Sequence, residues 1–137
     1  MADAPEIVLN RALAQLLDSA GMAVYQPTGT IPEKGIRLDG IMPTGVNEFT
    51  LLTSLDPVAE GRADMIWRVQ VYTRRIGTVN TVRQWASDLR ALLDQKEYTP
   101  ALLGISWSWR FSGLTFERDT QGRTAVAETY YFRGRRP

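Results

Sequence analysis

Two carboxylates lie close together near the end of the chain, at Glu117 and Asp119. Pairs of this kind can act as a general acid and a general base. A structural role explains them better, because Asp119 begins the stretch DTQG, where a short side chain caps a hairpin turn. Glu117 also lies within ion-pair range of Arg118 and Arg123. We therefore assign no catalytic role to either carboxylate.

The rest of the chain offers little other chemistry. Cysteine and histidine are both absent, which excludes disulfides and thiolate nucleophiles and removes the commonest metal ligand and proton carrier. A serine nucleophile would need Lys34 or Lys96 as its base, and Gly29 and Gly35 lack the spacing of a phosphate-binding loop. We expect no catalytic residue, no metal site and no cofactor, and hence a protein that is not an enzyme.

Aromatic residues alternate with arginines in the stretches WSWRF and TYYFRGRR. This combination could stack nucleic-acid bases and neutralise phosphates. The spacing of Trp107, Trp109 and Phe111 also predicts one buried face of a strand, and we favour that interpretation. Residues 133–137 are interpreted as a solvated basic tail, with binding to an acidic patch on another subunit as the alternative.

Charge is distributed unevenly along the chain. Residues 1–66 hold 4 basic and 9 acidic side chains, whereas residues 67–137 hold 12 basic and 6 acidic ones. The basic half could attract nucleic acid, or it could dock on the acidic half of the next copy. Arginine accounts for 14 of the 16 basic residues, and its guanidinium pairs well with carboxylates at interfaces.

Hydrophobic periodicity predicts the elements that position these residues. Helices are expected over residues 3–21, with Asp3 as N-cap, and over residues 80–95, with Asn80 as N-cap. Strands are expected over residues 22–26, 47–55, 64–74, 105–116 with a bulge at Gly113, and 123–132. Residues 26–47 contain three prolines and four glycines and show no periodicity, which predicts a long loop or arm.

These elements predict a single α+β domain over residues 1–137. Its mainly antiparallel sheet has four to five strands, and two helices pack on one face. The sequence contains no stretch of about 18 apolar residues, so no membrane span is predicted. The N-terminus lacks the pattern of a secretory signal, so we expect a protein that stays in the cytoplasm.

The order of these stretches resembles the tail-terminator family of long-tailed bacteriophages, also described as phage minor capsid proteins. The strand motif of that family matches at Val69, Gln70, Val71 and Arg74. Its hairpin turn matches at Arg118, Asp119, Gly122 and Arg123. The similarity extends over nearly the whole chain, although Glu128-Thr129-Tyr130 stands where the family often has an asparagine.

The resemblance implies a non-enzymatic ring, a hexamer, that caps the tail tube, ends its polymerisation and joins it to the head-side connector or stopper. Genomic DNA would pass through the lumen without sequence-specific binding. The protein would belong to the virion neck, assembled in the host cytoplasm. Residues 27–47 are expected to reach a neighbouring subunit or ring. The candidate subunit or tube contacts are Lys34, Arg37, Arg74, Arg75, Arg110, Arg118, Arg123 and Arg133.

Other functions are compatible with the same sequence. The nearest are a different neck protein, such as a head-completion or stopper protein, and a tail tube subunit. A small ligand-binding α+β protein would need a closed pocket with convergent polar groups. A nucleic-acid binder would show an affinity that falls steeply with salt.

Overall fold

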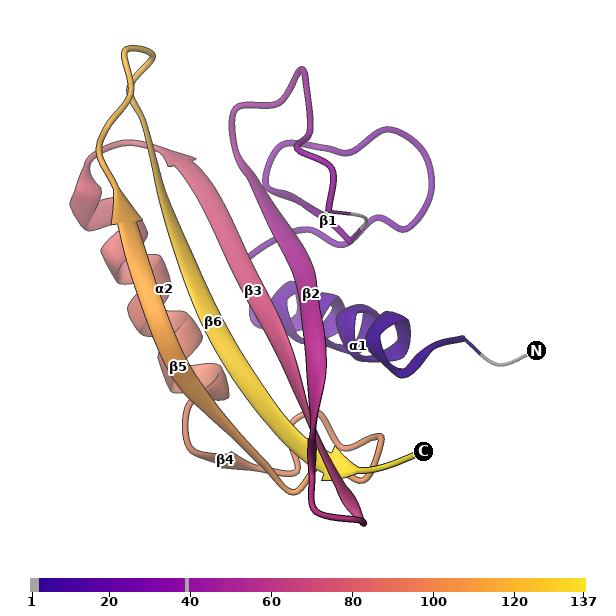
Figure 1. Ribbon diagram of the computed structural model, residues 1–137. Helices are drawn as coiled ribbons and strands as arrows, with labels where there is room; N and C mark the ends of the chain where they lie inside the picture. The colour runs from indigo at the N-terminus through magenta and orange to yellow at the C-terminus, as the bar shows by residue number, and fades with distance from the viewer. Residues whose placement is uncertain (1–2, 39) are drawn as a thin grey trace.

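The computed structural model describes residues 3–38 and 40–137 (Figure 1). The elements in chain order are α1 (Pro5–Ser19), β1 (Gly35–Arg37), β2 (Phe49–Glu60), β3 (Asp64–Ile76), α2 (Val79–Leu93), β4 (Lys96–Glu97), β5 (Trp107–Phe116) and β6 (Arg123–Arg135). In the described ranges, no helix is long and apolar enough to cross a membrane.

All the strands belong to one sheet, in the order β1-β2-β3-β6-β5-β4. The β1–β2 pair is parallel and the other pairs are antiparallel. Both helices lie behind the sheet in Figure 1, and the face toward the viewer carries no helix. The predicted α+β class is confirmed. The sheet has six strands rather than four to five, because β1 and β4 are only three and two residues long.

The core lies between the helices and the covered face of the sheet. Strand β3 alternates between the two faces, with Trp67, Val69 and Val71 almost fully buried. The helices add the apolar stripes predicted from their spacing, which include Leu9, Leu13, Leu17, Val82, Leu89 and Leu93. Full burial of each such side chain stabilises the fold by roughly 1.5 to 3 kcal/mol, so this packing fixes the helices on the sheet.

A charged side chain completes the core at the end of β3. Arg75 is only 5% exposed, and its guanidinium donates hydrogen bonds to the carbonyl oxygens of Phe49, Arg74 and Met22 at 3.1, 3.0 and 2.9 Å. The Trp85 indole N–H donates to the same Met22 oxygen at 3.0 Å. Burial lowers the pKa of Arg75. Arg75 therefore links the segment after α1 to β2 and α2 from inside the subunit.

The long loop predicted over residues 26–47 is tied to the sheet. It contains β1, and the Glu33 carboxylate accepts backbone N–H groups from Asn47 and Glu48 at 3.0 Å each. These bonds are the largest cause of the lowered pKa of Glu33. The backbone N–H of Lys34 also donates to the Glu48 carbonyl at 2.7 Å. The loop thus folds back on itself.

Several predicted boundaries are wrong. Strand β6 continues to Arg135, so residues 133–135 belong to the sheet rather than to the expected basic tail. The strand expected over residues 22–26 is a single bridge between Val24 and Gly35. Strand β2 continues past Pro57 to Glu60, because the register shifts between Leu55 and Val58 and leaves the proline outside the ladder. The bulge in β5 lies between Arg110 and Ser112 rather than at Gly113.

The predicted helix caps are also wrong. Helix α1 has Ala4 at its N-cap, and α2 has Thr78 there, with no side-chain capping bond at either position. Asp3 pairs instead with Arg11 at 2.5 Å, and Asn80 lies within α2.

Removal of the buried guanidinium should destabilise the fold. We expect Arg75→Met to lower the free energy of unfolding by about 2 to 4 kcal/mol, because buried carbonyl oxygens would lose their donors. Arg68→Met is the matched control on the same strand, since Arg68 makes an exposed bond to the Asp56 carbonyl, and its effect should stay below about 1 kcal/mol. Urea denaturation measures both; equal losses would contradict this role for Arg75.

Candidate interaction surface

The face of the sheet opposite the helices presents apolar and aromatic side chains in register across the strands. One row runs from Leu51 through Tyr72 and Ala127 to Leu114. A second row runs from Leu55 through Arg68 and Tyr131 to Trp109. We call this surface of β2, β3, β6 and β5 the open face.

Aromatic contacts organise the open face. The ring centroids of Tyr72 and Phe116 lie 5.8 Å apart on strands that flank β6, and the β6 alanine between them, Ala127, is 7% exposed. Phe111 stacks on Tyr131 with centroids 4.4 Å apart. Trp109 meets Tyr131 edge to face at 5.6 Å. These rings lie on the sheet without a helix to cover them.

The expectation that Trp107, Trp109 and Phe111 form a buried face is therefore wrong. The register pairs Trp107 with Arg133 and Trp109 with Tyr131, which places both tryptophans on the open face. Phe111 is 59% exposed. The core-facing position between the tryptophans belongs to Ser108, which is buried and donates to the Leu93 carbonyl at 2.6 Å.

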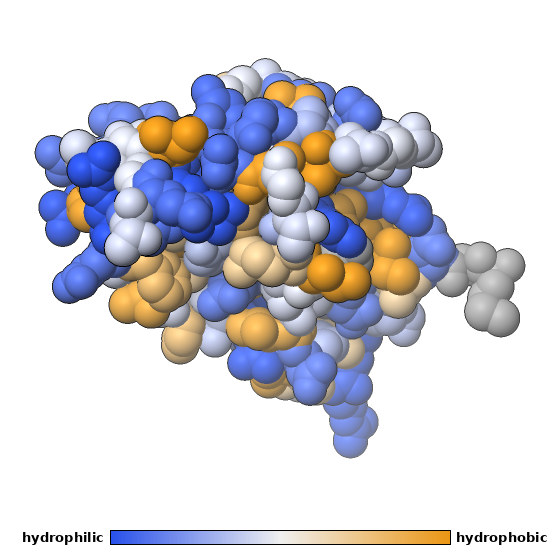
Figure 2. Space-filling view, turned by 90° about the horizontal axis from the view of Figure 1, so that it is seen from above, coloured by the Kyte–Doolittle hydropathy of each residue, from blue (hydrophilic) through white to orange (hydrophobic). Residues whose placement is uncertain are grey.

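Large apolar side chains remain accessible on the open face. The exposed fractions are 36% for Leu55, 45% for Val58, 60% for Leu114 and 40% for Phe116. Figure 2, which looks down on the end of the molecule with the β5–β6 turn, shows apolar residues as separate groups between hydrophilic ones. Several large, exposed apolar side chains on one face of a sheet make that face a candidate surface for contact with another macromolecule.

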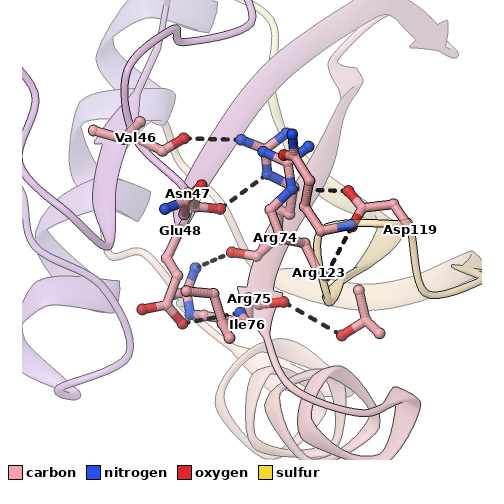
Figure 3. A network of polar contacts seen from close by, with 10 residues as sticks. Val46, Asn47, Glu48, Arg74, Arg75, Ile76, Asp119 and Arg123 are labelled. Carbon is pink, nitrogen blue, oxygen red and sulfur yellow. Dashed lines mark hydrogen bonds and ion pairs between the residues drawn. The ribbon is translucent and has the colours of Figure 1, made fainter.

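Arg74 lies at the upper end of the open face and holds the loop before β2 (Figure 3). Its guanidinium donates to the carbonyl oxygens of Asn47 at 2.9 Å and Val46 at 2.8 Å, and lies 4.6 Å from the centre of the Phe49 ring. Burial, followed by the charge of Arg123, lowers the pKa of Arg74. Arg74 and Arg123, two of the predicted contact residues, thus lie near each other.

Arg123 is held by the hairpin turn. The Asp119 carboxylate accepts backbone N–H groups from Gln121 and Arg123 at 2.9 Å each and pairs with the Arg123 guanidinium at 2.8 Å (Figure 3). These contacts lower the pKa of Asp119. The predicted turn-capping role of Asp119 is confirmed. The predicted ion pair of Glu117 does not form among the described residues, where Glu117 has no hydrogen-bond or ion-pair partner.

Two further arginines have carboxylate partners in the same chain. Arg110 pairs at 2.6 Å with Glu128, which is 2% exposed, and this hydrogen bond is the main cause of the raised pKa of Arg110. Gly113 makes room for the pair, since a Cβ there would collide with both side chains. Arg133 forms a two-bond ion pair with Glu60, one bond being 2.7 Å long.

The other predicted contact residues lie at the surface. Arg118 is exposed at the hairpin turn and makes no hydrogen bond or ion pair with the described parts of the chain. Lys34 is exposed just before β1, with a positive φ of 61°. Arg37 is half-buried at the end of β1. Arg75, by contrast, is inside the subunit, where it cannot reach a partner.

A metal site or a closed pocket would each place requirements on the described residues. Across residues 3–38 and 40–137, no group of three or more His, Cys, Asp or Glu side chains could hold a metal ion. The clefts of about 310, 700 and 710 Å³ are open to solvent. The arrangement is suited to contact with another surface through exposed apolar groups and through Arg118, which has no partner in the described parts of the chain.

The fold has a counterpart among known structures. No protein-family model and no curated protein sequence matches the chain. A chain from the virion of a native gene transfer agent particle is similar in fold. The TM-score is 0.61, at 12% sequence identity, and the match covers 97% of this chain and 96% of that chain. The similarity therefore concerns the whole domain.

The hairpin turn should give the protein a measurable acid sensitivity. Because the pKa of Asp119 is lowered from 3.8 in the folded state, its ionised form stabilises the fold at higher pH, and this contribution disappears as pH falls through the lowered pKa. We expect Asp119→Asn to be less stable than the parent at pH 7, with the difference starting to shrink below about pH 4 and vanishing once pH has fallen through the lowered folded-state pKa. Thermal unfolding from pH 7 to pH 2 measures this. Glu117→Gln is the control and should show no comparable pH-dependent difference.

Proposed function

We propose that the protein is a structural virion component of a phage-like particle, and specifically a tail terminator. In this role a ring of identical subunits, a hexamer, caps the tail tube, ends its polymerisation and joins it to the head-side connector or stopper. Genomic DNA passes through the lumen without sequence-specific recognition. The protein acts at the neck of the virion and has no catalytic activity.

The observation that carries the proposal is the end-to-end similarity to a virion chain of a gene transfer agent particle. It covers 97% of this chain and 96% of that chain, so it extends over the whole domain rather than one motif. A fold alone does not determine a function. The similarity supports a virion protein, and the resemblance of the sequence to tail terminators supports a role at the neck.

The open face supports assembly as the activity. Leu55, Val58 and Leu114 leave apolar area exposed that a second protein would bury. The cations Arg110, Arg123 and Arg133 are already paired within the chain, which leaves them little capacity to bind phosphates. The surface therefore favours protein contacts over nucleic-acid binding.

Tail-tube capping is the direct test of this function. The purified protein should form a closed ring in electron micrographs and in native mass spectra. Added to the polymerising tube protein encoded beside it, it should stop tube growth and be found at one end of each tube. Filaments formed by the protein alone would indicate a tube subunit instead. A protein that stays monomeric, alone and beside its tube, would contradict the proposal.

The open face should be needed for this assembly. We expect Leu114→Ser to weaken ring formation or tube capping at least tenfold in the concentration required, because an exposed apolar anchor is lost. Its unfolding free energy should change by no more than about 0.5 kcal/mol, since the side chain is 60% exposed. Tyr98→Ser is the control at another exposed position, 66% exposed after β4, and should leave assembly unchanged.

A further inference from the structure

A cleft of about 310 Å³ lies between the first half of α1 and β2. Helix α1 lines it with Glu6, Ile7 and Asn10, and β2 lines it with Thr53 and Ser54. It opens where β1 ends, because β1 pairs only with the first three residues of β2 and leaves the following residues without a neighbouring strand on that side. The cleft is separate from the open face, since Ser54 pairs with the core-facing Val69.

The wall of the cleft contains an unpartnered buried acceptor. Asn10 is only 5% exposed, and its side-chain nitrogen donates to the Ser54 hydroxyl at 3.0 Å. Its side-chain oxygen is buried and has no hydrogen-bond partner among residues 3–38 and 40–137. A buried polar atom without a partner destabilises a protein by about 1 to 3 kcal/mol, so a structure that retains one is suited to receiving a donor from outside.

The other groups of the cleft specify the charge of that donor. Glu6 lies one helical turn before Asn10, on the same face of α1. Its carboxylate has no ion-pair partner in residues 3–38 and 40–137. Ile7, which is 46% exposed, provides an apolar wall. A carboxylate, an amide oxygen and an apolar wall together fit a guanidinium on an aliphatic stem.

The chain presents such a group on its most protruding segment. The β5–β6 turn extends beyond the other strands at the top of Figure 1. Arg118 is exposed on this turn and has no hydrogen-bond or ion-pair partner in the parts of the chain that the structure describes. Its guanidinium lies beside Gly122, where an added Cβ would be 3.1 Å from Nη2. The turn itself is held rigidly by Asp119, so the arginine projects from a fixed base.

We infer that the cleft beside Asn10 receives Arg118 from a second copy of this chain. The guanidinium pairs with Glu6 and donates to the orphaned Asn10 oxygen. The two surfaces are different patches of one molecule, so the contact is head-to-tail, and repetition of such a contact generates a ring when the rotation closes. This inference rests on the proposed ring and names the polar contact that sets its register.

Thiol cross-linking tests the contact directly, because the chain contains no cysteine. Single variants Glu6→Cys and Arg118→Cys are mixed at a concentration where the parent protein is assembled, and treated with bismaleimidoethane. We expect a covalent dimer that requires both variants. Asp18→Cys replaces Glu6→Cys in the control mixture, since Asp18 is exposed at the far end of the same helix. Equal cross-linking in the two mixtures, or none in either, would overturn the inference.

Charge exchange tests whether the two side chains act as a pair. Glu6→Arg and Arg118→Glu should each weaken self-association at least tenfold in native mass spectrometry, and the double variant should regain most of it. Arg83→Glu on the exposed side of α2 controls for net charge. Arg118→Glu should unfold like the parent, because Arg118 is exposed. Glu6→Arg should stay folded with a slightly lower melting temperature, because Glu6 is half-buried in the first turn of α1, where a carboxylate is favoured. Double variants no better than the singles would refute the pairing.

The tests of the Glu6–Arg118 contact and of the proposed function can fail independently. A protein that caps tubes without the Glu6–Arg118 cross-link would retain the proposed role and lose this contact. A protein that shows the cross-link but neither closes a ring nor caps a tube would keep the contact and lose the role.

Discussion

The buried guanidinium of Arg75 is the constraint on which the rest of the fold depends. A charge moved out of water is strongly disfavoured unless its hydrogen-bonding capacity is met. Here the carbonyl oxygens of Met22 and Phe49 meet it, one from the segment after α1 and one from the start of β2. Trp85 of α2 donates to the same Met22 oxygen. The position of α1, the start of β2 and the position of α2 are thus set by one donor group at the end of β3.

Arg74, which precedes Arg75 in β3, shows that this strand contributes arginines to both faces of the sheet. Successive side chains of a strand point to opposite faces, so Arg75 enters the core while Arg74 lies on the open face and holds the loop before β2. The pattern of the sequence predicted β3, both helices and the hairpin turn correctly. The sequence could not predict that Arg75 enters the core while Arg74 lies on the open face. The acceptors of Arg75 are backbone carbonyls, which every residue has and which side-chain composition therefore does not reveal.

The faces of β5 were assigned incorrectly for a related reason. Alternation of apolar and polar residues shows that a strand has two unlike sides, and it does not show which side faces the core. The more apolar side is expected to do so. In β5 the core side carries Ser108 and Arg110 instead. Arg110 is tolerated there because Glu128 on β6 neutralises it and Gly113 leaves room for both side chains. That compensation comes from the neighbouring strand, 18 residues further along the chain, and it depends on the register between β5 and β6. Only the three-dimensional structure shows this register, and with it the aromatic open face.

The uneven charge along the sequence does not carry over unchanged to the folded molecule. The sheet order places β6, from the basic half, beside β3 and close to the β2–β3 turn. Glu60 and Arg133, which belong to opposite halves, pair within one subunit. Folding therefore pairs at least one acidic side chain of the first half with a basic side chain of the second half inside the same chain. In the proposed ring, attraction between copies would come from groups that folding leaves without a partner in the described residues. Apolar area on the open face would provide affinity, and polar groups such as Glu6 and Arg118 would provide orientation. Because these groups lie on different patches of the molecule, the proposed contact is head-to-tail rather than two-fold.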